Sequence, residues 1–246
     1  MKSTILLGIL CIASHVVFAQ LSKGTLFVGP TIGTGNYNSV NNNFEYADSG
    51  LRKTTNHNFG ISAGPQIGVF LTDHIVVGGN LGVDYTHNKT NVSSTEGNLN
   101  NNNTERSTLT INVGPFARYY FFNTTPGSTV MFAQMNARVG TGNGSSSGNG
   151  DNNVNTFSSA GKISNVFNWN AGGSLGVTHF IQKKVGLDLF AGYTYGTDKS
   201  HNINTTTFTP KAGGPNSVNT SEYDLTTHNN NFVVGAGFHW FFSHKS

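Results

Sequence analysis

Four charged residues occupy one face of chain segments that alternate between apolar and polar side chains: Asp84, Arg118, Arg138 and Asp188. The other members of that face are mostly Gly, Asn, Ser and Thr. Because an unpaired charge in a confined site is costly, charges of opposite sign on such a face are expected to pair. The four residues predict a salt-bridged interior cluster, with Arg118 and Asp188 at one depth and Asp84 and Arg138 at another. The charged lining of a small aqueous path stays open as the alternative.

General acid–base chemistry needs a histidine held close to a serine or a carboxylate. No histidine of this sequence has a fixed partner that can be read from spacing alone. We therefore expect no enzyme activity and no catalytic residue. The histidines weighed for such a role are His57, His87, His179, His201, His228 and His239.

Metal and cofactor sites are poorly supported. The stretch "DNNVN" at 151–155 alternates oxygen ligands as a calcium loop does, but Thr156 stands where such a loop needs Gly and Lys162 where it needs Glu. The one cysteine, Cys11, lies in the N-terminal apolar run, so the rest of the chain has no thiolate ligand. We expect no metal and no cofactor.

The elements that position the charges are read from a period of two. In "NFGISAGPQIGVF", residues 58–70, apolar side chains alternate with uncharged polar ones and glycine, as in a strand with two different faces. The same pattern recurs in eight segments, each able to supply the ~9–11 residues that a tilted strand needs to cross a bilayer. These segments begin at Thr25, Asn58, Ile75, Leu109, Val130, Trp169, Val185 and Asn231.

The connections between these segments alternate in length. Short turns and long polar stretches at opposite ends are typical of an up-and-down barrel in an outer membrane. The prediction is an all-β, closed eight-stranded antiparallel up-and-down transmembrane β-barrel, with the long stretches as mobile extracellular loops. The short turns are expected near 71–74, 122–128 and 180–184, and the long loops near 36–56, 88–106, 141–165 and 197–229.

The apolar face is expected to point to lipid, because the opposite face lacks the charges that a water-exposed sheet would carry. A narrow lumen suits its small residues. Aromatic side chains on the apolar face then form belts at the two membrane interfaces. The outer belt comprises Phe59, Tyr85, Trp169, Tyr193, Tyr195 and Phe232, and the periplasmic belt Tyr119, Phe121, Trp240 and Phe242.

The N-terminus predicts export. Residues 1–19 combine Lys2, an apolar run and a small residue at Ala19, which is the pattern of a cleaved signal peptide. The predicted barrel domain is then 20–246. The formal net charge of the whole chain is +3, of which Lys2 supplies one, and so weak a charge gives no reason to expect nucleic acid as a partner.

The segments "GPFARYYF" at 114–121 and "FVVGAGFHWFF" at 232–242 resemble the small eight-stranded outer-membrane barrels of Gram-negative bacteria, of the OmpX and OmpA-transmembrane type, often labelled porin family. The resemblance covers the chain after the signal peptide. It implies passage by periplasmic chaperones, insertion by the barrel assembly machinery, and termini in the periplasm. This sequence departs from the family in continuing with "SHKS" after Phe242.

Together these features favour an integral outer-membrane barrel with a packed polar interior, surrounded by membrane lipid and lipopolysaccharide. The expected role is structural or surface interaction, through an extracellular ligand of the loops. A narrow channel for ions or small solutes is the alternative. A lipid A modifying or proteolytic enzyme, as a few outer-membrane barrels are, is the third hypothesis.

Overall fold

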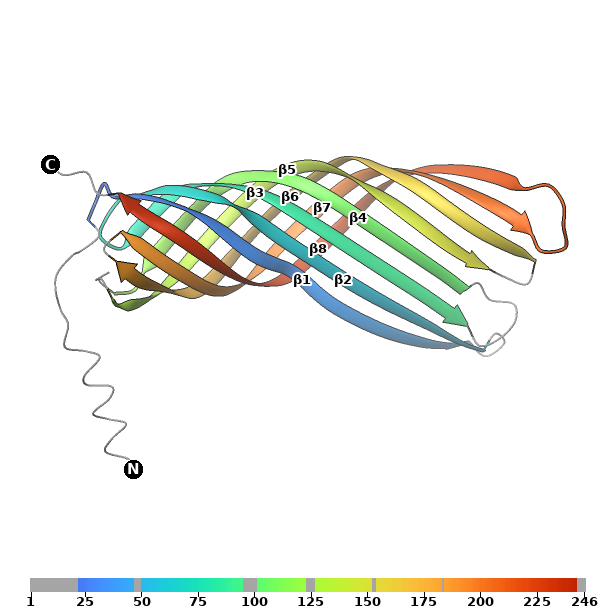
Figure 1. Ribbon diagram of the computed structural model, residues 1–246, viewed down its shortest axis with the longest axis horizontal. Coiled ribbons are helices and arrows are strands. Elements are labelled where there is room, and N and C mark those ends of the chain that lie inside the picture. Colours follow the sequence, from blue (N-terminus) through green and yellow to red (C-terminus); the bar gives the residue numbers. More distant parts are fainter. Residues whose placement is uncertain are drawn as a thin grey trace, which may run out of the picture.

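The chain forms one closed β-barrel (Figure 1). The computed structural model describes residues 22–46, 50–94, 101–122, 127–151, 154–182 and 184–242, and it describes the backbone alone at 34–46, 50–52, 94 and 101. The predicted signal peptide therefore lies outside the described residues. Among those residues, no helix has the length and hydropathy needed to cross a bilayer.

Eight antiparallel strands follow one another around the ring, as the alternation predicted. Each pairs with its neighbours in sequence, and β1 closes the ring against β8. We call the end where β1 begins and β8 finishes the short-turn end, and the opposite end the far end. The strands are β1 Leu26–Tyr46, β2 Gly50–Phe70, β3 Ile75–Ser94, β4 Asn101–Tyr120, β5 Thr129–Asp151, β6 Asn155–Gln182, β7 Val185–Pro210 and β8 Ser217–Phe242.

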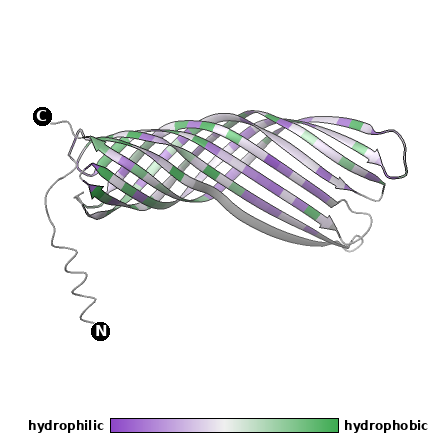
Figure 2. Cartoon of the chain, viewed as in Figure 1, coloured by the Kyte–Doolittle hydropathy of each residue, from purple (hydrophilic) through white to green (hydrophobic). Residues whose placement is uncertain are grey.

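The predicted long loops are wrong: most of their residues belong to strands. The strands have 20 to 28 residues, about twice what crossing a bilayer takes. In β5 the stretch "TGNGSSSGNGD" pairs with β4 as far as Asn101. Both faces of this far half are polar, so the apolar alternation that indicates a strand is absent from its sequence. Backbone ladders nevertheless continue, and Figure 2 shows the polar far half beside the more apolar short-turn half.

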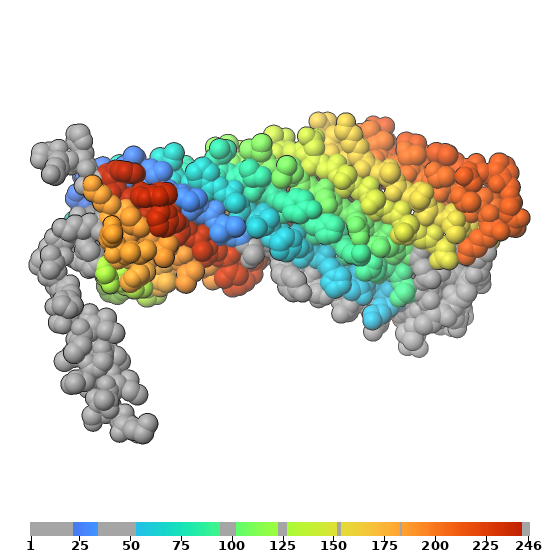
Figure 3. Space-filling model, in the orientation of Figure 1, coloured from blue at the N-terminus to red at the C-terminus, as the bar shows by residue number. Residues whose placement is uncertain are grey.

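The hairpin of β7 and β8 extends the far half. Its two strands stay in register from Val185↔Trp240 to Phe208↔Ser217. In the space-filling view its tip (orange) forms the end of the molecule opposite the start of β1 (Figure 3). The polar residues of 197–229, which the sequence predicted as a loop, are therefore held mainly in strands, with β7 paired to both β6 and β8.

The two faces of the short-turn half follow the predicted alternation. Apolar side chains on the outside are well exposed, for example Ile111 at 57% and Val113 at 56%. The inward face has glycines where large side chains need room. A Cβ at Gly235 would collide with the ring of Phe190, and one at Gly176 with the ring of Phe132. Glycine on one strand therefore makes space for an aromatic ring on another.

The seam between β1 and β8 is shorter than the other strand pairings. It runs from Leu26↔Phe242 to Gly35↔Val233, after which β1 continues paired with β2, and the rest of β8 with β7. Figure 1 shows the two strands separating beyond this point. The barrel is closed along the short-turn half, and in the far half β1 and β8 are no longer paired with each other.

A bulge in β6 fixes which side chains face inward near the middle of the barrel. The register shifts between Ser164 and Phe167, and Asn165 has a φ of 51°, a left-handed conformation that Asn tolerates better than most residues. Ile163 before the bulge and Asn168 after it are both buried. The bulge therefore keeps polar side chains such as Asn168 on the interior.

Candidate functional site

The interior of the short-turn half is filled by an aromatic plug rather than by the packed polar interior that the sequence predicted. Its rings contact one another across the lumen, with Phe180 and Phe241 at 5.3 Å between centroids and Phe70 and Tyr120 at 5.9 Å. Inward rings at the ends of strands were missed because they stand next to short polar turns, as Phe70 does at the end of β2. The plug consists of Phe27, Phe70, Val76, Phe116, Tyr120, Val130, Phe132, Phe180 and Phe241, with Phe190 packed against it.

Arg118 and Asp188 form a buried ion pair within this plug. Arg118 Nη1 lies 2.6 Å from Asp188 Oδ2, and the two side chains are 1% and 0% exposed. Arg118 also donates through Nε to Gln134 Oε1 at 2.8 Å. Its guanidinium carbon lies 4.0 Å from the centroid of the Phe132 ring. Strands β4 and β7 are thus joined across the lumen, at the depth at which the sequence placed both charges.

The remaining contacts of Asp188 complete a buried network. The hydroxyl of Thr178 donates to Asp188 Oδ1 at 2.7 Å, and His239 Nδ1 lies 3.2 Å from Oδ2. The His239 ring stacks on Phe27 with centroids 4.2 Å apart. Both carboxylate oxygens of Asp188 accept hydrogen bonds, and the residue is 1% exposed. This carboxylate therefore has a structural role inside the plug.

Asp84 and Arg138 form the second pair, nearer the middle of the barrel. Their closest charged atoms are 3.5 Å apart, and the side chains of Asp84 and Arg138 are 21% and 17% exposed. Ser62 donates to Asp84 Oδ1 at 2.5 Å and accepts from Arg138 Nη1 at 3.2 Å. Asn112 and Asn170 supply further contacts to the pair. This pair is looser and more accessible than Arg118 with Asp188.

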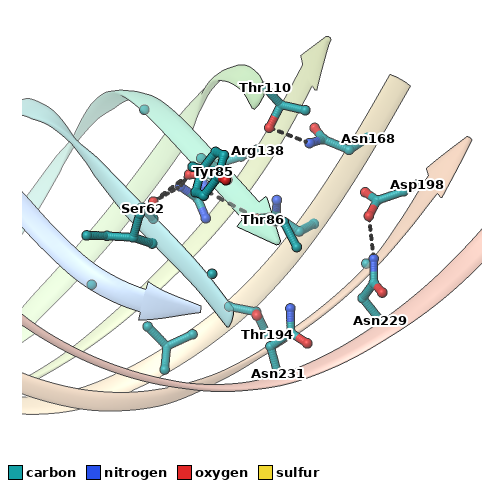
Figure 4. A pocket seen from close by; sticks show the side chains of 18 of the residues that line it. Ser62, Tyr85, Thr86, Thr110, Arg138, Asn168, Thr194, Asp198, Asn229 and Asn231 are labelled. Carbon is teal, nitrogen blue, oxygen red and sulfur yellow. Dashed lines mark hydrogen bonds and ion pairs between the residues drawn. The ribbon is translucent and has the colours of Figure 1, made fainter. Parts of the chain in front are cut away.

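A cavity of about 480 Å³ lies on the far side of the plug. Figure 4 shows its polar lining around Arg138. Arg106 donates to Ser200 Oγ at 2.9 Å, and Asn229 donates to Asp198 Oδ2 at 2.5 Å. The interior therefore has two zones: the aromatic plug toward the short-turn end, and a polar chamber toward the far end.

Two charges of the chamber lie beyond the outer aromatic belt and have shifted pKa values. Burial raises the pKa of Asp198, opposed by the hydrogen bond from Asn229 and by Arg106. Burial likewise lowers the pKa of Arg106. Both side chains are thus partly withdrawn from bulk water, and this burial is the main cause of each shift.

The predicted aromatic belts lie on the outside of the barrel. All ten residues are at least 38% exposed, and Trp169 contacts Tyr195 with ring centroids 5.7 Å apart, while Tyr119 and Phe121 are 5.4 Å apart. On neighbouring strands Tyr193 pairs with Phe232. The rings bound an apolar zone between them, and the polar far half lies outside that zone.

A histidine and a serine meet on the outside of the barrel. His87 Nδ1 is 2.9 Å from Ser107 Oγ, but the neighbouring carboxylate of Glu105 is bound to Lys89 at 2.8 Å. His201 lies between Glu222 and Asp224 without a serine. Across the described ranges, no group of three or more His, Cys, Asp or Glu side chains could hold a metal ion. A serine–histidine pair without an orienting acid is an incomplete catalytic arrangement.

A closed eight-stranded barrel with an apolar outer zone defines a membrane β-barrel protein. Residues 18–202 match the model of the outer membrane protein beta-barrel domain, and the chain belongs to this family. It is a protein of the outer membrane. No curated protein matches the chain.

A solved structure shows the same fold at low identity. The outer membrane protein OprG from Pseudomonas aeruginosa is 13% identical, with 91% of this chain and 98% of that chain covered and a TM-score of 0.52. The outer membrane protein AlkL, studied in lipid bilayers, is 10% identical, with 94% and 96% covered and a TM-score of 0.33. The likeness to OprG is one of fold.

Proposed function

We propose that the protein is a non-conducting outer-membrane barrel whose far half presents a polar β-surface outside the cell, in a structural or surface-interaction role. The aromatic plug is the observation that carries this proposal. An eight-stranded lumen is just wide enough to be filled by side chains, and here nine buried apolar residues meet across it. We expect such a packing to leave water and ions no open path.

We place the short-turn end in the periplasm, together with both termini. Short periplasmic turns and longer external segments are the rule for these barrels, and the strands extend far beyond the apolar zone at one end. Trypsin added to intact cells should then cut after Lys211, between β7 and β8. Lys184, at the short-turn connection between β6 and β7, is also exposed and should stay intact. Cleavage after Lys184 with Lys211 protected would invert the topology.

The partners follow from the surfaces. The apolar zone would contact membrane lipid, and the outer belt the lipopolysaccharide leaflet. Periplasmic chaperones and the barrel assembly machinery would serve biogenesis. An extracellular ligand would meet the far half, whose surface is mainly Asn, Ser and Thr on paired strands, so its groups are held in fixed positions rather than on mobile loops.

Conductance of the purified protein in a planar bilayer tests the role. The wild type should give no steady current. Phe70→Ala/Phe180→Ala removes two rings of the plug and should produce one. The matched control is Phe157→Ala/Phe208→Ala, which removes a ring pair of the far half at 6.1 Å between centroids and should remain silent.

A narrow channel is the second candidate, favoured by the chamber of about 480 Å³ and its Asp84–Arg138 pair. Steady wild-type currents, with an ion selectivity that changes in Arg138→Ala while stability does not, would replace our proposal with this one. We do not propose catalysis, because the contact of His87 with Ser107 lacks an orienting carboxylate.

A further inference from the structure

Two of the side chains that line the chamber are buried carboxamides with unpaired polar atoms. Asn80 is 8% exposed, and both its Nδ2 and its Oδ1 have no hydrogen bond. Gln66, its cross-strand partner on β2, is 7% exposed with Oε1 unpaired. Both residues line the chamber. A buried donor or acceptor left unpaired costs stability. Two neighbouring carboxamides with unpaired atoms therefore indicate a role in binding a molecule that enters the chamber.

Further unpaired oxygens lie across the chamber. Asn168 on β6 is 6% exposed, and its Nδ2 donates to Thr110 while its Oδ1 is free. Asn231 on β8 also lines the chamber with Oδ1 unpaired. Figure 4 shows these two side chains on separate strands around the cavity. Carboxamides with unpaired groups therefore come from several strands around the chamber.

The charged side chains of the chamber already have polar partners. Its lining contains two arginines and two aspartates: Arg106, Arg138, Asp84 and Asp198. Arg138 faces Asp84, Asn229 donates to Asp198 and Arg106 donates to Ser200. The four formal charges sum to zero, and each charged side chain has a partner, so the unpaired hydrogen-bonding groups belong to carboxamides. An ionic ligand would have to displace one of these partners, whereas a neutral one would not.

The volume of the chamber and the residues that line it narrow the class of ligand further. A volume of about 480 Å³ falls within the ~300–1,000 Å³ of small-molecule sites. Phe190 and Val233 line the chamber together with the polar groups, which gives an apolar surface for C–H groups. Many hydroxyls with no net charge, around a ring with C–H faces, describe a small saccharide.

We propose that the chamber is a binding site for a neutral hydroxylated small molecule, a mono- or disaccharide, which enters from the far end and contacts Asn80, Gln66 and Asn168. Because the plug closes the other side, the molecule is held and not passed through. This inference goes beyond the surface role proposed above and does not depend on conductance.

The test is saturation-transfer NMR and calorimetry of the full chain in detergent micelles, with glucose and maltose as probes at millimolar concentrations. Asn80→Leu and Gln66→Leu keep the side-chain size but remove the polar atoms. Each should weaken binding by about tenfold or more, the loss of one well-made hydrogen bond, while the unfolding temperature does not fall. Thr25→Val is the control, because Thr25 Oγ1 is equally buried and unpaired but lies outside the chamber.

Charged analogues test the chemical class. Glucuronate and glucosamine should bind at least about tenfold more weakly than glucose, because each would have to displace the present partner of a charged side chain. The inference is overturned if neither neutral sugar binds the wild type, if Asn80→Leu and Gln66→Leu bind as the wild type does, or if a charged analogue binds as tightly as glucose. Asn168→Leu provides a further variant on the opposite wall, should either of the first two fail to fold.

Discussion

Replacing Arg118 with Met should destabilise the barrel more than any other single loss of an interior charge named above. Arg118→Met leaves the carboxylate of Asp188 in a site where its side chain is 0% exposed. Thr178 and His239 still contact that carboxylate, but the cation that balances it is gone. Methionine fills much of the vacated volume, so the loss reports the charge rather than a cavity.

The magnitude can be worked from the contacts. The charged hydrogen bond to Asp188 is worth about 1.5–3 kcal/mol, and a desolvated cation over an aromatic ring, as here over Phe132, about 2 kcal/mol. Their sum agrees with the ~3–5 kcal/mol expected for breaking a buried pair. Arg138→Met should cost only about 1 kcal/mol, because its pair with Asp84 is partly exposed and screened by water.

Urea titration of refolding in lipid vesicles, followed by tryptophan fluorescence, measures both losses. The double variant Arg118→Met/Asp188→Leu should recover most of the stability lost in either single variant, since a buried pair can often be replaced by apolar side chains. The reasoning is refuted if Arg118→Met costs no more than Arg138→Met, or if the double variant shows the sum of the two single losses.

Two further predictions concern the wall of the barrel. Val113→Arg places a charge in the apolar zone and should cost about 2–4 kcal/mol in the same titration, whereas Ser158→Arg, on the wet far half, should cost about 0–1 kcal/mol; equal losses would contradict the assignment of the lipid face. His201 is held between carboxylates, and the hydrogen bond to Asp224 in particular raises the pKa of the imidazole. The stability it gives the β7–β8 hairpin is fully present below the unfolded-state pKa of histidine and is lost as the pH rises through the higher folded value. Hydrogen exchange of that hairpin should show this loss, Asp224→Asn should lower the His201 pKa measured by NMR, and an unchanged titration would refute it.

The sequence was sufficient to predict the barrel itself, because membrane strands need an apolar face and that face has a period of two. It also placed all four interior charges on one face. It could not tell how tightly each pair would form, since the contact of Arg118 with Asp188 depends on the tilt and register of strands far apart in the chain. The difference between the buried pair and the looser Arg138–Asp84 pair emerges from packing alone.

The far half was missed for a different reason. A stretch such as "TGNGSSSGNGD" in β5 has the composition of a loop, and its strand state depends on backbone bonds to β4 and β6 that no side-chain pattern reveals. The unpaired carboxamides of Asn80 and Gln66 could not be recognised at all, because a polar inward residue looks the same in sequence whether its hydrogen bonds are made or not.

The short seam has a consequence for how the chain reaches its closed state. Seven of the eight strand pairings join neighbours in sequence, so each can form as a hairpin, while the seam must bring Leu26 to Phe242. Bringing distant ends together costs chain entropy and slows folding, so closure is expected to come last. The hydrocarbon core of the membrane favours closure of the seam, because unpaired backbone groups are very costly there. Beyond Gly35 water can hydrogen-bond to the free backbone groups of both strand edges, so β1 and β8 need not pair over the rest of their length.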